Sequence, residues 1–579
     1  MSKRASRSKN RGSVSREQGT TDSQQEKKGD ANTTATMNGV MLEHRRKHSS
    51  FDTTSPSSQA ASLMGHSNFS LDDEVPKLGE DDEGSSKGFF ELSKKDQRNF
   101  LLLVLLYFLQ GIPMGLAHGS VPFLLKHSVS YAAIGVFSLA AYPYSLKLLW
   151  SPIVDAVWSP SIGRRKSWIL PIQTISGFSM IWLGKNINRM MKEAGESDSG
   201  VWNFTWWWFA LVFLCATQDI AVDGWALTLL SKENLAYAST AQTVGLTAGQ
   251  FLSYTVFLAF NSKDFANKWF RTTPAETGIM ELDGYLSFWG WAYLIVTFGL
   301  AVMKREDRDR NGDGIGEVYR TMWGILKLKN IQSFIIIHLI AKIGFQANDA
   351  VTSLKLLDKG LKQEQLSLVI LVDFPVEVFL GYYIGKWCQS YPPMHIWCWS
   401  FVGRLVAAGF AQFVVSIFPA GGASGGFLLL VIAEHVLSTF MNTVMFVAVS
   451  AFHAKISDPL IGGTYMTLLA TVSNLGGTFP RYFVLKAVDM FTSATCIPPT
   501  GTPKAGLKGP LVTQSFSCSL EAEKHRCIEG GGVCNVTTDG YYIVNILCIV
   551  IGVVTFWGYI KPAVMRIQAL PLRAWRIAA

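Results

Sequence analysis

The sequence predicts an all-α membrane protein with about 12 transmembrane helices in two pseudo-symmetric six-helix halves. Composition, apolar runs and an internal repeat support this fold class. Of the 579 residues, 49% are hydrophobic and only 16% are charged, whereas soluble proteins carry about 25% charged residues. This low share of charge is typical of a surface that lipid covers instead of water.

Twelve apolar runs have roughly the length of 20 residues that an α-helix needs to cross a bilayer. They predict an N-terminal half over 98–303, a cytoplasmic linker over 304–330 and a C-terminal half over 331–561. The runs lie at about 99–124, 130–152, 168–186, 206–230, 237–260, 285–303, 331–356, 366–387, 396–418, 425–452, 460–486 and 541–561.

The segments outside these runs indicate the orientation. Residues 1–97 are polar and have no apolar stretch of the kind found in a signal peptide, so they predict a disordered cytoplasmic tail. Lys and Arg recur in alternate short loops, as in Gly163-Arg-Arg-Lys166, which places both termini, including the tail 562–579, in the cytoplasm. The net charge of +9 is scattered rather than gathered into a patch, which argues against nucleic-acid binding.

The loop 488–540, before the last run, contains four cysteines and the sequon Asn535-Val-Thr537. Disulfides and glycosylation at Asn535 are both expected on the non-cytoplasmic side of the membrane. Free thiols or a metal site are the alternatives, but the cysteine spacing matches no zinc pattern, and we predict no metal. Three pairings are open for the four cysteines, which are Cys496, Cys518, Cys527 and Cys534.

The chain partly repeats itself at an offset of about 230 residues, where segment 124–134 resembles 356–366 and segment 243–251 resembles 471–479. A parallel duplication of six-helix halves resembles the major facilitator superfamily. Asp155 with Arg164 and Arg165 resembles the loop signature of that superfamily, although the gap after Asp155 is longer. We therefore expect these three residues to form a latch, the alternative being a simple positively charged loop.

Two carboxylates, Asp219 and Asp223, lie four residues apart inside an apolar run, so both face the same side of a helix near mid-membrane. Each charge at that depth costs at least about 2.5–3.5 kcal/mol, which indicates a substrate, proton or gating site. A buried ion pair that only fastens helices is the alternative. Other polar candidates within the runs are Gln110, Lys147, Lys342, Asn348, Asp349, Lys355, Glu434 and Asn474.

The position of a residue in the twelve-run order predicts which way it faces. By analogy with the superfamily, runs one, four, seven and ten line the cavity, so Arg404 on run nine is expected to face outward. Run eleven, with Asn474, is small and polar, and it serves either close packing or a moving gate. No Walker A sequence, His-Glu-x-x-His motif or nucleophile elbow is present, so we predict neither an ATP-driven pump nor catalytic residues nor a cofactor.

The block QDIAVDGWALT at 218–228 resembles the hallmark of the acetyl-coenzyme A transporter family, and it adds Gln218 and Trp225 to the candidate residues. The blocks SLKLLW at 145–150, AKIGF at 341–345 and TVSNLGG at 471–477 are similar to the same family, and the resemblance extends over about 98–560. The shorter core of the first block is also similar to bacterial muropeptide permeases.

The resemblance implies a multi-pass solute carrier of the endoplasmic reticulum membrane that moves acetyl-CoA from the cytosol into the lumen. Lumenal acetyltransferases would then use the product. Because acetyl-CoA is a polyanion, Lys147, Lys342 and Lys355 are expected to meet its phosphates. Asp219 and Asp223 would pair with the lysines when the site is empty.

Two other functions are alternatives to acetyl-CoA transport. The first is a carrier of a different organic anion. The second is a membrane-bound acyltransferase that uses acetyl-CoA at Glu434 and His435. The sequence does not give the oligomeric state, and a homodimer is one option.

Overall fold

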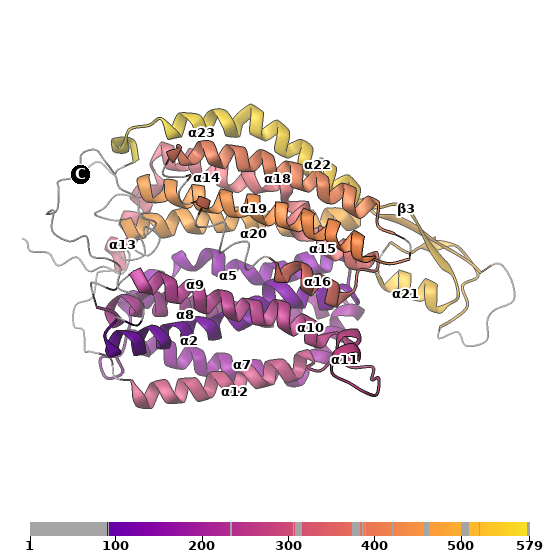
Figure 1. Cartoon of the computed structure of the whole chain (residues 1–579), viewed down its shortest axis with the longest axis horizontal. Coiled ribbons are helices and arrows are strands. Elements are labelled where there is room, and N and C mark those ends of the chain that lie inside the picture. The colour runs from indigo at the N-terminus through magenta and orange to yellow at the C-terminus, as the bar shows by residue number, and fades with distance from the viewer. Residues whose placement is uncertain are drawn as a thin grey trace, which may run out of the picture. The chain divides into compact units, whose positions relative to one another are not determined.

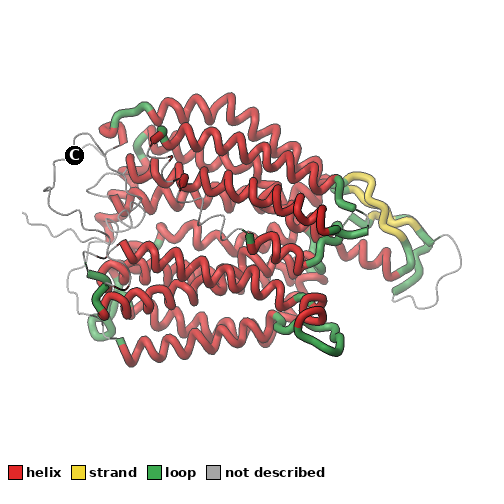
Figure 2. Tube along the Cα trace, in the orientation of Figure 1, coloured by secondary structure: helices red, strands yellow, loops and turns green. Residues whose placement is uncertain are grey.

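The computed structural model describes residues 90, 92–231, 234, 236–304, 306, 315–372, 383–384, 387, 390–419, 421–456, 462–499, 509–519 and 521–575. Most of the predicted tail 1–97 and parts of the predicted linker 304–330 and of the predicted span 366–387 lie outside these residues. The described chain is helical apart from one small sheet (Figure 1, Figure 2).

The N-terminal half has helices at each of its six predicted spans. Its second span is divided into short segments, two of which begin close to Pro143 and Pro152, because proline lacks the N–H that would continue a helix. The elements are α2 (Lys94–Gly115), η2 (Leu116–Ser120), α3 (Val121–Lys126), α4 (Tyr131–Ser138), η3 (Leu139–Ala141), α5 (Tyr142–Leu146), η4 (Lys147–Leu149), α6 (Ser151–Ala156), α7 (Lys166–Glu196), α8 (Asp198–Leu229), α9 (Ala236–Phe251), η6 (Leu252–Val256), α10 (Phe257–Asn261), α11 (Lys263–Trp269) and α12 (Leu282–Met303).

The C-terminal half follows α13 (Ile315–Leu326), a helix within the predicted linker. Its first span is interrupted by a short 3-10 segment that begins at Lys342. The elements are α14 (Lys329–Ala341), η7 (Lys342–Phe345), α15 (Gln346–Asp358), α16 (Gln363–Leu371), α18 (Pro393–Ser416), α19 (Gly425–Ile456), α20 (Gly462–Phe491), α22 (Gly540–Thr555), η8 (Phe556–Ile560), α23 (Lys561–Gln568) and η9 (Leu572–Trp575).

Among the described residues, nine helical stretches are long and apolar enough to cross a membrane. The long helices α7 and α20 occupy the predicted third and eleventh spans but are not among those nine. The predicted eighth span lies only partly within the described residues. The multi-pass helical fold is therefore present, and the number of twelve spans stays a prediction.

The segment between α20 and α22 forms a small disulfide-linked unit that the sequence did not predict to be a sheet. It contains β1 (Ser493–Ile497), β2 (Phe516–Ser517), α21 (Glu521–Glu529) and β3 (Val533–Thr538), with antiparallel strands in the order β2-β1-β3. Disulfides join Cys496 to Cys527 and Cys518 to Cys534. The predicted disulfides are thus present, and this pairing is one of the three that the sequence left open.

The helical bundle has two ends, which lie on opposite sides of the predicted membrane. The disulfide side is the end at which β1–β3 and α21 lie, and the terminal side is the opposite end, where α2 begins (Figure 1). The predicted tail 562–579 includes Trp575, which is buried against Phe334 and Phe452 of the C-terminal half. The Tyr465 hydroxyl also donates to the Trp575 carbonyl oxygen at 2.9 Å.

Glycines allow α2 and α9 to pack with their backbones in contact. A Cβ atom added to Gly111 of α2 would lie 2.5 Å from the Leu246 carbonyl oxygen of α9. One added to Gly249 of α9 would overlap the Phe108 carbonyl oxygen of α2. Small residues commonly permit such close helix contacts in membranes, and here they bring the first and fifth spans together.

Candidate functional site

A polar network in the N-terminal half is centred on Asp219. This fully buried carboxylate of α8 accepts a hydrogen bond from the Gln110 side-chain amide of α2 at 2.6 Å. It also forms an ion pair with Lys147 of η4. A buried carboxylate needs such partners, because its water is lost and not otherwise replaced. The network therefore connects the first, second and fourth spans.

Asp223 lies one turn further along α8 and shares Lys147, whose ammonium is 3.7 Å away. The Tyr107 hydroxyl donates to Asp223 at 2.7 Å, and the Gln242 amide donates to it at 2.8 Å. Tyr107 and Gln242 were not among the predicted site residues. A tyrosine gives little signal in an apolar run, whereas the amide of Gln242 is a polar signal of the same kind as Gln110. One cation thus bridges both carboxylates, while neutral donors satisfy their other oxygens.

The neighbouring residues of the same block have different environments. Both polar atoms of the Gln218 side chain are buried and have no hydrogen-bond partner among the described residues. Trp225 is buried in the apolar core between α2, α8 and α9. Trp225 therefore contributes to the packing between helices. Gln218 is a buried polar side chain whose hydrogen-bonding capacity is not used by the described residues.

The three predicted latch residues lie together at the terminal side. Asp155 forms an ion pair with Arg165, and its carbonyl oxygen accepts a hydrogen bond from Arg164 at 3.0 Å. The Arg165 guanidinium packs against Gly224 of α8, where any side chain would overlap it. Glu306 accepts hydrogen bonds from the backbone N–H groups of Arg165 and Lys166, each at 2.8 Å, where a carboxylate also opposes the positive end of the α7 dipole.

Two adjoining cavities lie where the halves meet. They have volumes of about 510 and 290 Å³, and both are lined by His118, Asn442 and Arg481. Lys342 lines the larger cavity, while Arg404 lines the smaller one. We call the two together the central cavity. The acidic side chains that line it are Asp349 and Glu434.

Arg404 contradicts its predicted outward orientation. Its side chain is 1% exposed, forms an ion pair with Asp349 and donates to the Ser438 carbonyl oxygen at 3.0 Å. Its guanidinium also lies 4.7 Å from the centre of the Phe345 ring. The prediction was wrong because span order alone does not fix how a helix is rotated about its axis. A buried charge must find a carboxylate partner, and Asp349 provides it.

The other predicted residues are distributed between the central cavity and its surroundings. Asn348 lines the cavity, donates to Ser438 at 3.1 Å and accepts from Thr352 at 2.9 Å. Lys355 is outside it and forms an ion pair of 2.6 Å with Asp539 on the disulfide side. Asn474 is exposed on α20. Lys147, Asp219 and Asp223 belong to the N-terminal network and do not line the described central cavity.

His118 and Arg481 line both parts of the central cavity and were not among the predicted site residues. Arg481 follows Pro480 inside the eleventh predicted span, and an arginine within an apolar run is itself a signal of function. It was not selected because the analogy directed attention to spans one, four, seven and ten. His118 lies in η2, a local π-helical distortion of the kind that often occurs at functional sites.

Several polar contacts join the two halves on the disulfide side. Lys126 of α3 lies 3.0 Å from Asp358 of α15, and the Tyr131 hydroxyl donates to Asp358 at 2.6 Å. Asp489 of α20 accepts from the backbone N–H of Ala132 at 2.6 Å, so it caps α4 of the opposite half. We call this set the disulfide-side gate, because it holds the two halves together on the disulfide side.

A more exposed pair extends this gate. Lys362 donates a hydrogen bond of 2.8 Å to Asp264, which belongs to α11 of the other half. The bond from Lys362 holds the pKa of the Asp264 carboxyl below its usual value. The same bond raises the pKa of the Lys362 ammonium. Both partners are therefore charged around neutral pH.

A two-part helical bundle with a charged cavity between its parts is the architecture of the major-facilitator fold. The solved nucleoside transporter NupG is similar in fold, with a TM-score of 0.53 over 82% of this chain and 100% of that chain at 12% identity. A bacterial homolog of the human lysosomal transporter Spinster has a TM-score of 0.50 over 83% of this chain and 100% of that chain, at 14% identity. The chain matches the family described as acetyl-coenzyme A transporter 1 over residues 99–313, 303–396 and 390–577, and it belongs to that family.

Relatives of known sequence extend along most of the chain. An uncharacterized membrane protein of Saccharomyces cerevisiae is 42% identical over 84% of this chain and 98% of its own length. An uncharacterized protein of Schizosaccharomyces pombe is 39% identical over 87% of this chain and 93% of its own length. The anhydromuropeptide permease of Escherichia coli is 28% identical, but only over 26% of this chain and 29% of its own length. The family to which the chain belongs is described as a transporter family, so the protein is a transporter and not the acyltransferase considered as an alternative.

Proposed function

We propose that this protein moves acetyl-CoA from the cytosol into the lumen of the endoplasmic reticulum by alternating access of its two halves. Membership of the acetyl-coenzyme A transporter family supports the substrate. The observation that carries the proposal is the group of cations around the central cavity, which includes Lys342, Arg404 and Arg481. Such groups suit the phosphates of a nucleotide-like polyanion.

The charge balance of the central cavity favours an anionic solute. Three cations, Lys342, Arg404 and Arg481, line the cavity against two carboxylates. Asp349 pairs with Arg404 and Glu434 is the second carboxylate, whereas neither Lys342 nor Arg481 has an ion pair among the described residues. These two side chains are the candidates to bind phosphate directly. The larger volume of about 510 Å³ lies within the range of roughly 300–1,000 Å³ typical of ligand pockets, and the adjoining volume of about 290 Å³ extends it.

The location of the disulfide side supports the proposed orientation. Two disulfides form readily in an oxidising compartment such as the endoplasmic reticulum lumen. Asn535 is exposed on β3, where a glycan can be attached without disturbing the core. The terminal side, where α2 begins, would then face the cytoplasm, as predicted for both termini. With the disulfide-side gate formed, this conformation suits loading from the cytosol and later release to lumenal acetyltransferases.

The N-terminal network is assigned the role of a switch rather than that of a primary substrate site. Lys147 is held by Asp219 and Asp223 and lies outside the described central cavity. A shift of Lys147 between these two carboxylates would change how η4 and α8 are joined. Because η4 is part of the divided second span, such a change would reach α4 and the gate.

Uptake into proteoliposomes tests the function directly. Purified protein is reconstituted alone, and the lumen of each vesicle is assayed for labelled acetyl-CoA with empty liposomes as the control. We expect saturable uptake. Absence of saturable uptake by correctly folded protein would refute acetyl-CoA as the substrate.

A carrier of a different organic anion is the second candidate, and the local similarity to anhydromuropeptide permease favours testing it. Unlabelled acetyl-CoA, free nucleotides and an anhydromuropeptide are offered as competitors in the same uptake assay. Competition by acetyl-CoA alone supports the first proposal. Stronger competition by the muropeptide supports the second.

A further inference from the structure

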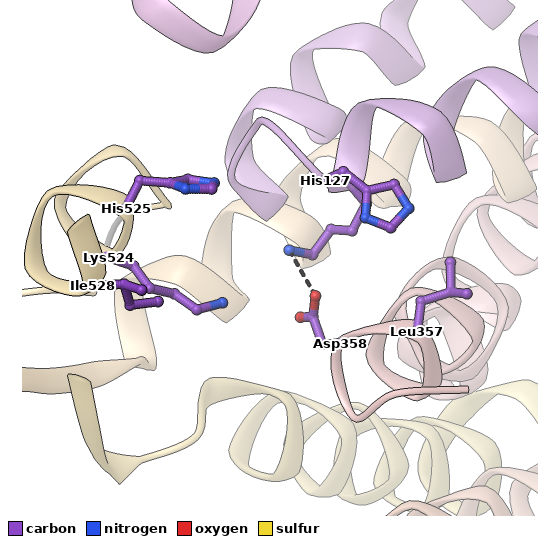
Figure 3. Close-up of a pocket in the computed structure, with 7 residues that line it drawn as sticks. His127, Leu357, Asp358, Lys524, His525 and Ile528 are labelled. Atoms are coloured by element: carbon purple, nitrogen blue, oxygen red, sulfur yellow. Dashed lines mark ion pairs between the residues drawn. The ribbon is translucent and has the colours of Figure 1, made fainter. Parts of the chain in front are cut away.

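A separate pocket lies on the disulfide side, outside the central cavity (Figure 3). It has a volume of about 280 Å³ and is lined by residues from three parts of the chain. Lys126 and His127 come from the N-terminal half, Asp358 comes from the C-terminal half, and Lys524 and His525 come from α21. Figure 3 shows Lys524 and His525 on one side of the pocket and His127 and Asp358 on the other.

The lining of this pocket is mostly basic. Two lysines and two histidines surround one carboxylate, Asp358, which already accepts contacts from Lys126 and Tyr131. The Lys126 side chain is only 3% exposed, so its ammonium is held where water screens it weakly. A cation in such a position attracts an anion more strongly than the same cation on the surface.

The disulfides give the pocket a fixed wall. Cys527 follows His525 by two residues and is bonded to Cys496 of β1. β1 begins at Ser493, two residues after α20 ends at Phe491. The bond therefore ties α21, with Lys524 and His525, to the end of a bundle helix. A wall that is already in place lowers the entropy that a ligand must overcome on binding.

We propose that this pocket, the disulfide-side pocket, binds a phosphate group. It is built jointly by the two halves and the disulfide-linked unit, and its ligand is either a soluble phosphate compound or the headgroup of an anionic lipid. A phosphate in the pocket contacts Lys126 and competes with Asp358 for that ammonium. Occupation therefore loosens the disulfide-side gate. The site is independent of which solute the central cavity carries.

The test uses the full chain in nanodiscs of phosphatidylcholine, titrated calorimetrically with pyrophosphate at low salt. We expect the double variant Lys524→Gln/His525→Gln to bind pyrophosphate at least about tenfold more weakly than the wild type, which corresponds to about 1.4 kcal/mol. The matched control is Arg189→Gln/Lys192→Gln, which removes two exposed cations of α7 that do not line the pocket. This control is expected to keep wild-type affinity.

Three results would overturn the proposal: no pyrophosphate binding by the wild type, equal binding by the wild type and the pocket variant, or an equal loss in the control variant. Repeating the titration in nanodiscs containing phosphatidylserine separates the two sources of phosphate. A preserved difference between wild type and pocket variant assigns the site to soluble phosphates. Disappearance of that difference shows that a lipid headgroup occupies the pocket.

Discussion

The ammonium of Lys126 lies 3.0 Å from the carboxylate of Asp358, and the two residues belong to opposite halves of the bundle. Neither half can leave the other on the disulfide side without breaking this pair and the Tyr131 hydrogen bond beside it. Alternating access requires that such contacts be strong enough to close the gate and weak enough to open. The substitution Asp358→Asn isolates this requirement, since it keeps the size of the side chain.

We expect Asp358→Asn to weaken the closed gate, because a neutral amide balances the buried charge of Lys126 less well than the carboxylate does. Hydrogen exchange of the amides at 130–135 should be about tenfold faster, which corresponds to about 1.4 kcal/mol. Glu196→Gln, which removes an exposed pair with Lys192, is the control. Unchanged exchange in Asp358→Asn would mean that the pair does not hold the gate.

Asp219→Asn is expected to reduce uptake at least about tenfold, equivalent to about 1.4 kcal/mol, while folded protein is retained. The Asn oxygen can still accept from Gln110, but the charge that holds Lys147 is lost. Uptake and the yield of monodisperse protein are measured together. Asp223→Asn is the comparison, with a smaller effect expected because Lys147 lies 3.7 Å away. Wild-type uptake in Asp219→Asn would leave the pair with a purely structural role.

Arg481→Gln tests the central cavity. We expect the KM for acetyl-CoA to rise by about tenfold, because a cation that meets phosphate is removed, with little change in folded protein. The exposed substitution Lys192→Gln serves as the control. Equal KM values for Arg481→Gln and the wild type would exclude Arg481 from substrate binding.

The Cys496–Cys527 disulfide is expected to stabilise the disulfide-linked unit but not the helical bundle. Its removal by Cys496→Ser/Cys527→Ser is expected to destabilise the disulfide-linked unit by about 3–4 kcal/mol, since the loop of 31 residues gains freedom when unfolded. Limited proteolysis should then cut within 509–538, while the helices of the bundle stay intact. Resistance equal to the wild type would show that other contacts hold this unit.

The Asp264–Lys362 pair predicts how the gate responds to pH. The pKa of Asp264 is lowered, so its contribution is present above the ordinary value of about 3.9 and is lost as the pH falls through the lowered value. The pKa of Lys362 is raised, so its contribution is present below about 10.4 and is lost as the pH rises through the raised value. Spin labels on α11 and α16 should therefore report a constant distance from about pH 5 to pH 9.

The matched variant for this experiment is Lys362→Gln. It should give the wider distance throughout the same range if the pair holds α11 near α16. A wild-type distance that changes between pH 6 and pH 8 would contradict the assignment. Because both side chains are largely exposed, high salt should weaken the effect.

The apolar runs predicted the helical membrane fold because length and hydropathy are local properties of the chain. The small sheet at 493–538 was missed because its strands are short and are paired through contacts between distant residues. In the N-terminal network, Gln110 and Lys147 were candidates because they are polar residues in apolar runs, and Lys147 was expected to pair with the aspartates. Tyr107 gave no such signal, since a tyrosine in an apolar run is equally suited to packing.

Arg404 shows the limit of reasoning from the order of the spans. The sequence shows a charged arginine within an apolar run. The rotation of α18 that directs the Arg404 side chain toward Asp349, however, depends on packing with other helices. Arg481 was overlooked for the same reason. Individual charged residues can thus be found in the sequence, whereas the cavity that gathers them requires the tertiary structure.

The backbone contact between Gly111 of α2 and the Leu246 carbonyl region of α9 has a practical consequence for watching this transporter move. Helices that touch through their main chains cannot slide or rotate against each other without a steric clash, so the first and fifth spans behave as one strut. A single fluorophore on the exposed face of α9 would therefore report the displacement of α2 as well. The strut offers a fixed internal reference against which rocking of the C-terminal half can be measured in single molecules.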